Sequence, residues 1–226
     1  LPPRGSDAAD VAGNTWDLAP FSPPPAALRG GELYIYRNAY NLVPRSIGEC
    51  RGGLRALKFF GNDVEVLPPE AGDLDGLQSL QLKVSAPRVS GAVLRRMRAL
   101  RELELSMVPP RPSACSILVE IAGLKCLTKL TICHFSIRFL PPEIGSLRKL
   151  QELDLSFNKL KNLPNWITEL RALKFLKVTN NKLVDLPSGI SSLRCLESLD
   201  LSNNRLTSLG SVELVSMLTL QYLNLQ

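Results

Sequence analysis

A motif that recurs every 23 residues runs through most of this chain and limits what it can fold into. It is clearest in LQELDLSFNKLKNLP (150–164) and LKFLKVTNNKLVDLP (173–187), and further copies open at Leu127 and Leu196. The shared pattern is LxxLxLxxNxLxxLPxxIxxL. One such unit can bury its apolar side only against its neighbours, so the sequence predicts a solenoid of stacked coils.

Each coil is expected to contain one short strand and one return segment. In the LxL part, alternate side chains point inward to the core and the residues between them point outward. In the PxxIxxL part, proline fixes the turn and a short helical segment returns Ile and Leu to the core. The predicted fold class is therefore α/β: a curved right-handed coil with parallel strands on its concave face and short helical or irregular segments on its convex face.

The repeat domain is expected to cover residues 30–226, with about eight repeats and a truncated ninth that opens at Leu220. The segments that open at Leu77 and Leu100 keep only their strand leucines, so residues 77–126 are predicted to be degenerate repeats. Residues 1–29 contain six prolines and are predicted to be a flexible lead-in or a partial N-terminal cap.

Asparagine recurs where each coil turns off its strand, and a buried amide there can bond the backbone groups that the bend leaves unpaired. These residues are predicted to form a structural ladder, which Phe135 interrupts in one repeat. The ladder comprises Asn38, Asn62, Asn158, Asn181 and Asn204.

A partner protein is expected to bind the outward strand residues, where charged and aromatic side chains gather as they do in binding hot spots. Phe157 and Phe175 are the first expected contacts; the alternative is that some of these aromatic side chains only pack against the adjacent strand. The predicted surface comprises Tyr34, Tyr36, Arg37, Lys58, Phe60, Lys83, Glu102, Glu104, Lys129, His134, Glu152, Asp154, Phe157, Phe175, Lys177, Asp200 and Tyr222.

Catalytic chemistry finds little support in the sequence. A Cys/His pair could be formed by Cys133 and the single histidine, His134, but adjacent strand residues normally point to opposite faces. Scattered cysteines and one histidine do not supply a metal site, and no phosphate-binding motif occurs. We therefore expect no catalytic residue, no cofactor and no metal, and ATP binding only if a kinase domain follows.

Charge and cysteine usage indicate which partners and which cellular compartment the chain has. The net charge of +6 is spread along the chain, and the densest run, Arg95, Arg96 and Arg98, is expected to lie on a solvated face, so no nucleic-acid partner is predicted. The five cysteines show no metal-ligand or disulfide pattern, and no Asn-x-Ser/Thr site occurs. With no signal peptide and no apolar stretch of membrane-spanning length, a cytoplasmic location is predicted.

The endings LPPEIGSL (140–147), LPNWITEL (163–170) and LPSGISSL (186–193) resemble those of the intracellular, Ras-group leucine-rich-repeat proteins. The segments LYIYRNAYNLVPRSIG (33–48), LRALKFFGNDVEVLPPE (54–70) and CLTKLTICHFSIRFLPPEIG (126–145) are similar to the amino-terminal repeats of plant Raf-related leucine-rich-repeat kinases. That resemblance implies a protein-interaction scaffold in intracellular signalling, or the recognition region of a Ser/Thr kinase whose catalytic domain lies beyond this chain. No kinase motif is present in these residues. A third hypothesis, a plant immune receptor, would require an upstream nucleotide-binding domain.

Overall fold

In the computed structural model, the described residues are 8–11, 31–36, 43, 45–60, 67–84, 91–107, 116–210 and 212–226. They form one parallel sheet in which ten strands lie side by side in sequence order. The strands are β1 (Ala8–Val11), β2 (Glu32–Tyr36), β3 (Ala56–Phe60), β4 (Ser79–Val84), β5 (Glu102–Met107), β6 (Lys129–Cys133), β7 (Glu152–Asp154), β8 (Phe175–Lys177), β9 (Ser198–Asp200) and β10 (Tyr222–Asn224).

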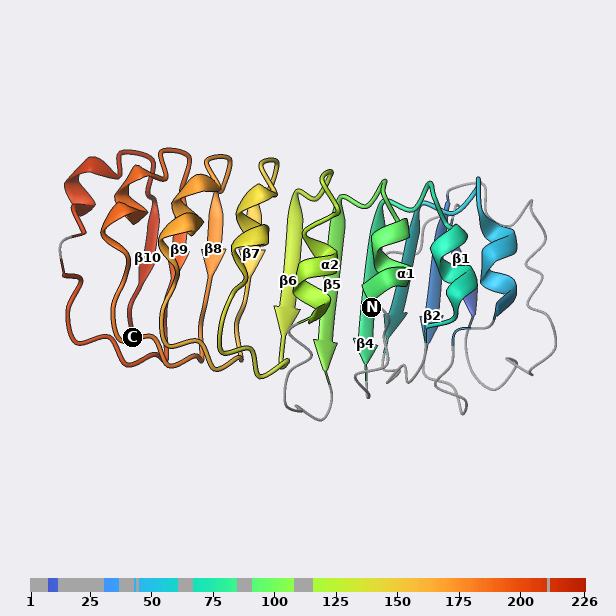
Figure 1. Cartoon of the computed structure of the whole chain (residues 1–226), viewed down its shortest axis with the longest axis horizontal. Helices are drawn as coiled ribbons and strands as arrows, with labels where there is room; N and C mark the ends of the chain where they lie inside the picture. Colours follow the sequence, from blue (N-terminus) through green and yellow to red (C-terminus); the bar gives the residue numbers. More distant parts are fainter. Residues whose placement is uncertain are drawn as a thin grey trace.

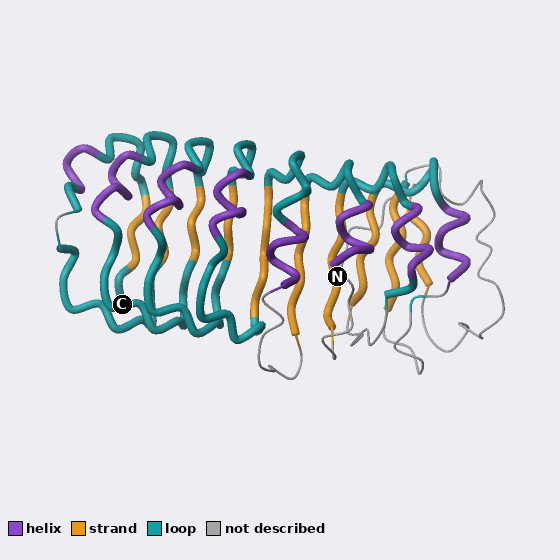
Figure 2. Tube along the Cα trace, in the orientation of Figure 1, coloured by secondary structure: helices purple, strands orange, loops and turns teal. Residues whose placement is uncertain are grey.

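The strand register follows the sequence repeat. Leu153 pairs with Leu130 of the preceding strand and with Leu176 of the next, so equivalent positions of neighbouring coils lie side by side. Helical segments cover one face of the sheet along its length (Figures 1 and 2). The predicted leucine-rich-repeat solenoid is therefore confirmed.

The return segments differ with their sequence. Where a proline precedes the segment, as Pro164 does with φ −70° and ψ 154°, a single 3-10 turn follows and Ile167 enters the core. In residues 77–126, where this proline motif is missing, the described return segments α1 and α2 are α-helical, whereas η7, which also lacks the proline, keeps a 3-10 turn. The helices are η2 (Arg45–Cys50), η3 (Pro69–Asp73), α1 (Gly91–Arg96), α2 (Ser116–Ile121), η4 (Pro142–Ser146), η5 (Asn165–Glu169), η6 (Ser188–Ser192) and η7 (Leu214–Ser216).

The core is a continuous stack of leucines between the sheet and the return segments. Leu153 and Leu176 of the strands and Leu147 and Leu170 of the return segments are fully buried. Each such side chain contributes about 1.5–3 kcal/mol when it leaves water, so the stacked leucines supply most of the stabilising burial. No helix among the described residues has the length and apolarity to cross a bilayer.

Asparagine side chains close the turn off the strand in three coils of the described chain. The Asn158 side-chain oxygen accepts hydrogen bonds from the backbone N–H groups of Phe135 (3.0 Å) and Ile137 (3.3 Å) in the preceding coil. Its amide donates to the Ile132 and Leu155 carbonyls, each at 2.8 Å. The amide therefore satisfies backbone groups of two coils and ties them together.

Asn181 and Asn204 repeat this arrangement. Their side-chain oxygens accept from Leu160 (3.0 Å) and Leu183 (3.1 Å) of the coil before. Phe135, at the equivalent position, is buried and supplies no such bonds to the coil before it. The two other ladder asparagines, Asn38 and Asn62, lie outside the described residues.

The structure describes part of the predicted lead-in and the arginine run that was expected to lie on a solvated face. Within residues 1–29, the described part is β1, which pairs in parallel with β2 from Ala8 opposite Glu32.

In the run of arginines at positions 95, 96 and 98, Arg95 lies 3.8 Å from Glu120, and Arg96 pairs with Asp73 and donates to the Pro69 carbonyl. These exposed arginines therefore bridge the return segments of neighbouring coils.

Candidate functional site

The outward side chains of β2–β10 form one surface, which we call the strand face. Along β5 the burial alternates, with Leu103 and Leu105 buried and Glu102 and Glu104 exposed. Because the strands are in register, outward residues of successive coils form rows across the sheet. One row runs through Glu104, Thr131, Asp154, Lys177 and Asp200.

Most of the residues predicted to bind a partner lie on this face. The side chains described there are those of Lys58, Lys83, Glu102, Glu104, Lys129, Glu152, Asp154, Phe175, Lys177, Asp200 and Tyr222. Phe157 and His134 lie just beyond the strand ends of their coils. Arg37 and the side chains of Tyr34, Tyr36 and Phe60 fall outside the described part of the chain.

A hollow of about 440 Å³ lies on the strand face between β5 and β9. Thr131 and Ser198 contribute to it although they were not singled out from the sequence, because only charged and aromatic outward residues were selected there. Their places in the repeat could have identified them. The hollow is lined by Glu104, Lys129, Thr131, Glu152, Leu153, Asp154, Phe175, Leu176, Lys177, Ser198 and Asp200.

The hollow carries more negative than positive charge. Four carboxylates and two lysines line it, which gives a formal charge of −2 at pH 7, whereas the whole chain carries +6. Lys129 lies 3.7 Å from Glu152, and because both side chains remain partly exposed to water this ion pair contributes at most about 1 kcal/mol. The charges therefore remain available to a partner.

Backbone bonds hold two of the carboxylates in place. Asp154 accepts from the Ser156 N–H at 2.9 Å, and Asp200 accepts from the Ser202 N–H at 3.2 Å and its hydroxyl at 2.9 Å. A group held in one orientation loses less conformational entropy on binding. These two aspartates are thus pre-organised on either side of Lys177.

Phe175 lines the hollow, and two further aromatic rings stack on each other in the turns that follow β6 and β7. The ring of His134 stacks on that of Phe157, with 4.7 Å between centroids and 16° between planes. Both residues adopt left-handed backbone conformations, with φ of 64° and 58°. The next two coils place Asn180 and Asn203 in this conformation, and asparagine tolerates it better than a bulky residue does. Because this conformation recurs at the equivalent position of four successive coils, it belongs to the turn of the repeat, and it leaves the Phe157 side chain 48% exposed.

The Cys133 and His134 pair lacks the properties of a nucleophile and its base. Burial raises the pKa of the Cys133 thiol to about 12, and the neighbouring Asp154 and Glu104 carboxylates act in the same direction. His134 stacks on Phe157. Within the described residues, no group of three or more His, Cys, Asp or Glu side chains could hold a metal ion.

Alkylation rates test whether the Cys133 thiol is as unreactive as its raised pKa indicates. With a pKa of about 12, only about one thiol in ten thousand is ionised at pH 8, and the thiolate is the reactive form. We expect iodoacetamide to modify the exposed Cys195 well before Cys133, with the Cys133 rate still rising above pH 10. Peptide mass spectrometry of timed samples measures both rates, and rapid labelling of Cys133 at pH 7 would contradict the assignment.

Comparison with known proteins agrees with the solenoid. The family model described as leucine-rich repeat region matches residues 96–226. No curated protein matches the chain in sequence. A crystal structure of internalin C2 from Listeria monocytogenes has a TM-score of 0.64 at 20% identity, covering 89% of this chain and 84% of that one.

A second similar structure is the ectodomain of the Arabidopsis receptor kinase HAESA in complex with an IDA peptide hormone. It has a TM-score of 0.64 at 23% identity and covers 86% of this chain, which spans only 36% of that ectodomain. At these identities the likeness shows the fold alone. The family match covers more than half of the chain and agrees with the register of the strands, and the protein therefore belongs to the leucine-rich-repeat family.

Proposed function

We propose that this chain is a protein-interaction scaffold that binds a segment of a partner protein across the strand face. The observation that carries the proposal is the hollow between β5 and β9, where pre-organised carboxylates adjoin the exposed ring of Phe175. Exposed aromatic groups beside oriented charges are typical of binding hot spots. Rigid coils present these groups over a long front, as other solenoids do.

The charge of the hollow indicates the complementary partner. Lysine or arginine side chains complement its net negative charge, and a cation over the face of Phe175 gains a further contribution of about 0.5–1 kcal/mol. Phe157, in the turn after β7, and Tyr222, in β10, are both exposed and offer further apolar area. A basic segment with at least one apolar side chain therefore fits this surface.

Selection from a displayed library of random peptides tests the proposal, because the selection requires no candidate partner. We expect enriched peptides to be basic, and Phe175→Ala and Asp154→Asn each to weaken their binding about tenfold, which corresponds to 1.4 kcal/mol. Val215→Ala, which truncates an exposed side chain of η7 in a return segment, is the matched control. Unchanged affinity in both strand-face variants would overturn the proposal.

The role in intracellular signalling belongs to the same proposal. It is supported by the three LPxxIxxL endings, by the absence of glycosylation motifs, and by unpaired cysteines at positions 50, 126, 133 and 195. Localisation of a fluorescent fusion of the full-length protein tests it, and secretion would exclude it.

A second candidate function is the recognition region of a plant Ser/Thr kinase related to the Raf group. The resemblance of residues 33–48, 54–70 and 126–145 supports it. Translating the transcript beyond Gln226 distinguishes the two candidate functions. A Gly-rich loop followed by HRD and DFG would establish a kinase, whereas further repeats and a cap would establish a stand-alone adaptor.

A further inference from the structure

A second surface lies at the edge where the chain leaves the strands. There the backbone continues a ladder between coils: the N–H groups of Lys159, Lys182 and Arg205 each donate at 2.8 Å to a carbonyl of the coil before. We call residues 136–139, 159–162, 182–185 and 205–208 the ladder edge. The hydrogen bonds and the buried asparagines beside them hold its side chains at a fixed spacing of about 4.8 Å per coil.

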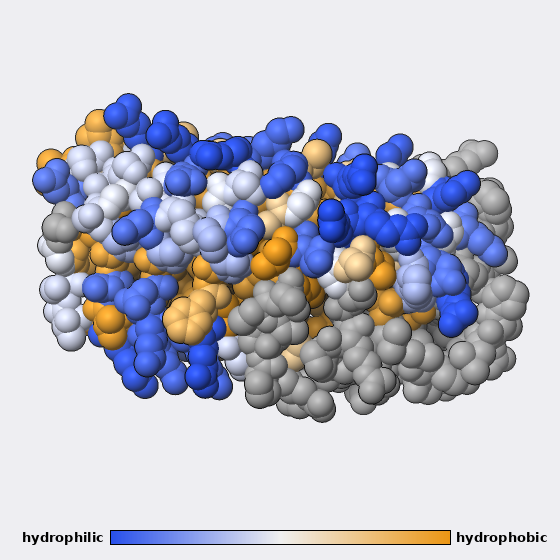
Figure 3. All heavy atoms as spheres, in the orientation of Figure 1, coloured by the Kyte–Doolittle hydropathy of each residue, from blue (hydrophilic) through white to orange (hydrophobic). Residues whose placement is uncertain are grey.

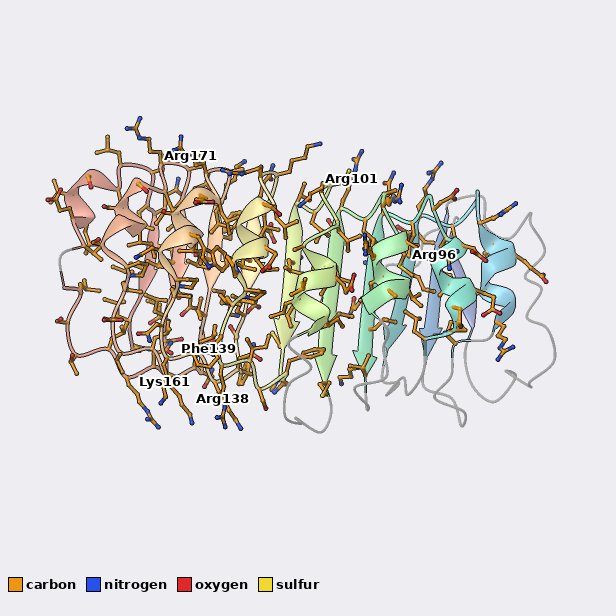
Figure 4. The ribbon with its side chains drawn as sticks, in the orientation of Figure 1. Arg96, Arg101, Arg138, Phe139, Lys161 and Arg171 are labelled. Carbon is orange, nitrogen blue, oxygen red and sulfur yellow. The ribbon has the colours of Figure 1, made fainter. Side chains whose placement is uncertain are left out.

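Inward and outward side chains still alternate along this edge, so some of its apolar residues are buried in the core and others are exposed to solvent. Ile137, Leu160 and Leu183 point into the core and are fully buried. Phe139, in contrast, is 78% exposed, and Val184 is also exposed. Figure 4 shows Phe139 at this edge with Arg138 and Lys161, on the side of the solenoid opposite Arg101 and Arg171.

The ladder edge is strongly basic. Five of its residues are cationic, and its single carboxylate, Asp185, lies 3.1 Å from the Asn162 amide, which donates to it. None of the five cations forms an ion pair with any residue that the structure describes. Figure 3 shows a strongly hydrophilic cluster at this edge beside apolar side chains. The five are Arg138, Lys159, Lys161, Lys182 and Arg205.

We infer that the ladder edge is a docking surface for an acidic peptide segment that carries an apolar side chain. The exposed Phe139 ring is the anchor, since burying an aromatic ring of this size releases more free energy than burying any other exposed group of the edge. The cations around it complement carboxylates. Lys159, Lys182 and Arg205 span about 10 Å, and alternate side chains of an extended peptide are about 6.7 Å apart, so two acidic residues can face three cations.

This composition favours a peptide over other anionic partners. A single ring and a valine give little apolar area to insert into a bilayer, and Asp185 would be repelled by anionic lipid. Single-stranded nucleic acid prefers successive aromatic platforms, of which Phe139 provides one. The inference stands independently of the strand face, because the two surfaces share no residue.

The test is fluorescence anisotropy with a labelled glutamate-rich peptide that contains one central leucine. We expect salt-sensitive binding that is lost when the glutamates become glutamines and weakened when the leucine becomes serine. Phe139→Ala should weaken binding about tenfold, and Lys161→Glu combined with Lys182→Glu should weaken it by a further factor of about ten.

The matched control is Arg171→Glu combined with Arg194→Glu, which makes the same charge change at two exposed positions. Figure 4 shows Arg171 on the opposite side of the solenoid, and Arg194 occupies the equivalent position one repeat later. This control should leave the affinity within about twofold. Equal loss in both double variants would show attraction by net charge alone and overturn the inference. Stronger, Phe139-dependent binding to phosphatidylcholine vesicles that contain phosphatidylserine would overturn it in favour of a membrane. Circular dichroism of each variant verifies that the fold is retained.

Discussion

Replacing Asn158 with alanine is expected to lower the free energy of unfolding by about 3 kcal/mol. The side chain is only 7% exposed and bonds the backbone N–H groups of Phe135 and Ile137 and the Ile132 and Leu155 carbonyls. Alanine would leave these groups without the partner that the amide supplies, and each buried unsatisfied group costs about 1–3 kcal/mol. Urea denaturation followed by circular dichroism measures the change.

The control for this substitution is Asn165→Ala, because Asn165 is exposed at the start of η5. A change within about 0.5 kcal/mol is expected there. A similar loss for both variants would mean that the destabilisation does not come from the buried amide. Asn158→Asp separates the two halves of the interaction, since it keeps the acceptor for Phe135 and Ile137 and removes the donor.

Replacing Leu176 with alanine is expected to destabilise the protein by about 3 kcal/mol. Leu176 lies in β8, is 1% exposed, and pairs in register with Leu153 and Leu199. Its truncation removes apolar burial and leaves a cavity that adjacent coils cannot close, because their spacing is fixed by the strand hydrogen bonds. The loss should appear as a lower denaturation midpoint in urea.

A substitution of the same type at an exposed site is the control for Leu176. Leu218 is 91% exposed, so Leu218→Ala should change the stability by less than about 0.5 kcal/mol. A Leu176→Ala variant as stable as the wild type would show that the stacked leucines do not carry the stability of this solenoid. A binding assay on the same variant separates loss of fold from loss of the strand face.

The fold was largely predictable from the sequence because leucine spacing reports directly which residues are buried. Leu150, Leu153 and Leu155 occupy the repeat positions that the pattern assigns to the core, and all three are buried. The pattern was less informative where proline is missing. In residues 77–126 the return segments α1 and α2 are α-helical, which the strand leucines alone could not indicate.

The candidate site was predictable only in part. Period-2 alternation places Asp154, Phe175 and Lys177 on the outward side of their strands, since that direction depends on local geometry. It does not indicate that Asp154 and Asp200 are held by serine groups of their own turns, or that His134 stacks on Phe157. Those contacts depend on how the chain turns off the strand and on which coil comes next.

The repeat, its 23-residue length and the side of the sheet to which each strand residue points could be derived from the order of amino acids, because they follow from local spacing. Which side chains meet across coils could not be derived in this way, since residues 23 positions apart become neighbours only through register and stacking. The ladder edge illustrates this difference. Its cations are scattered along the sequence between Arg138 and Arg205, and they form one surface only because successive coils bring equivalent positions into line.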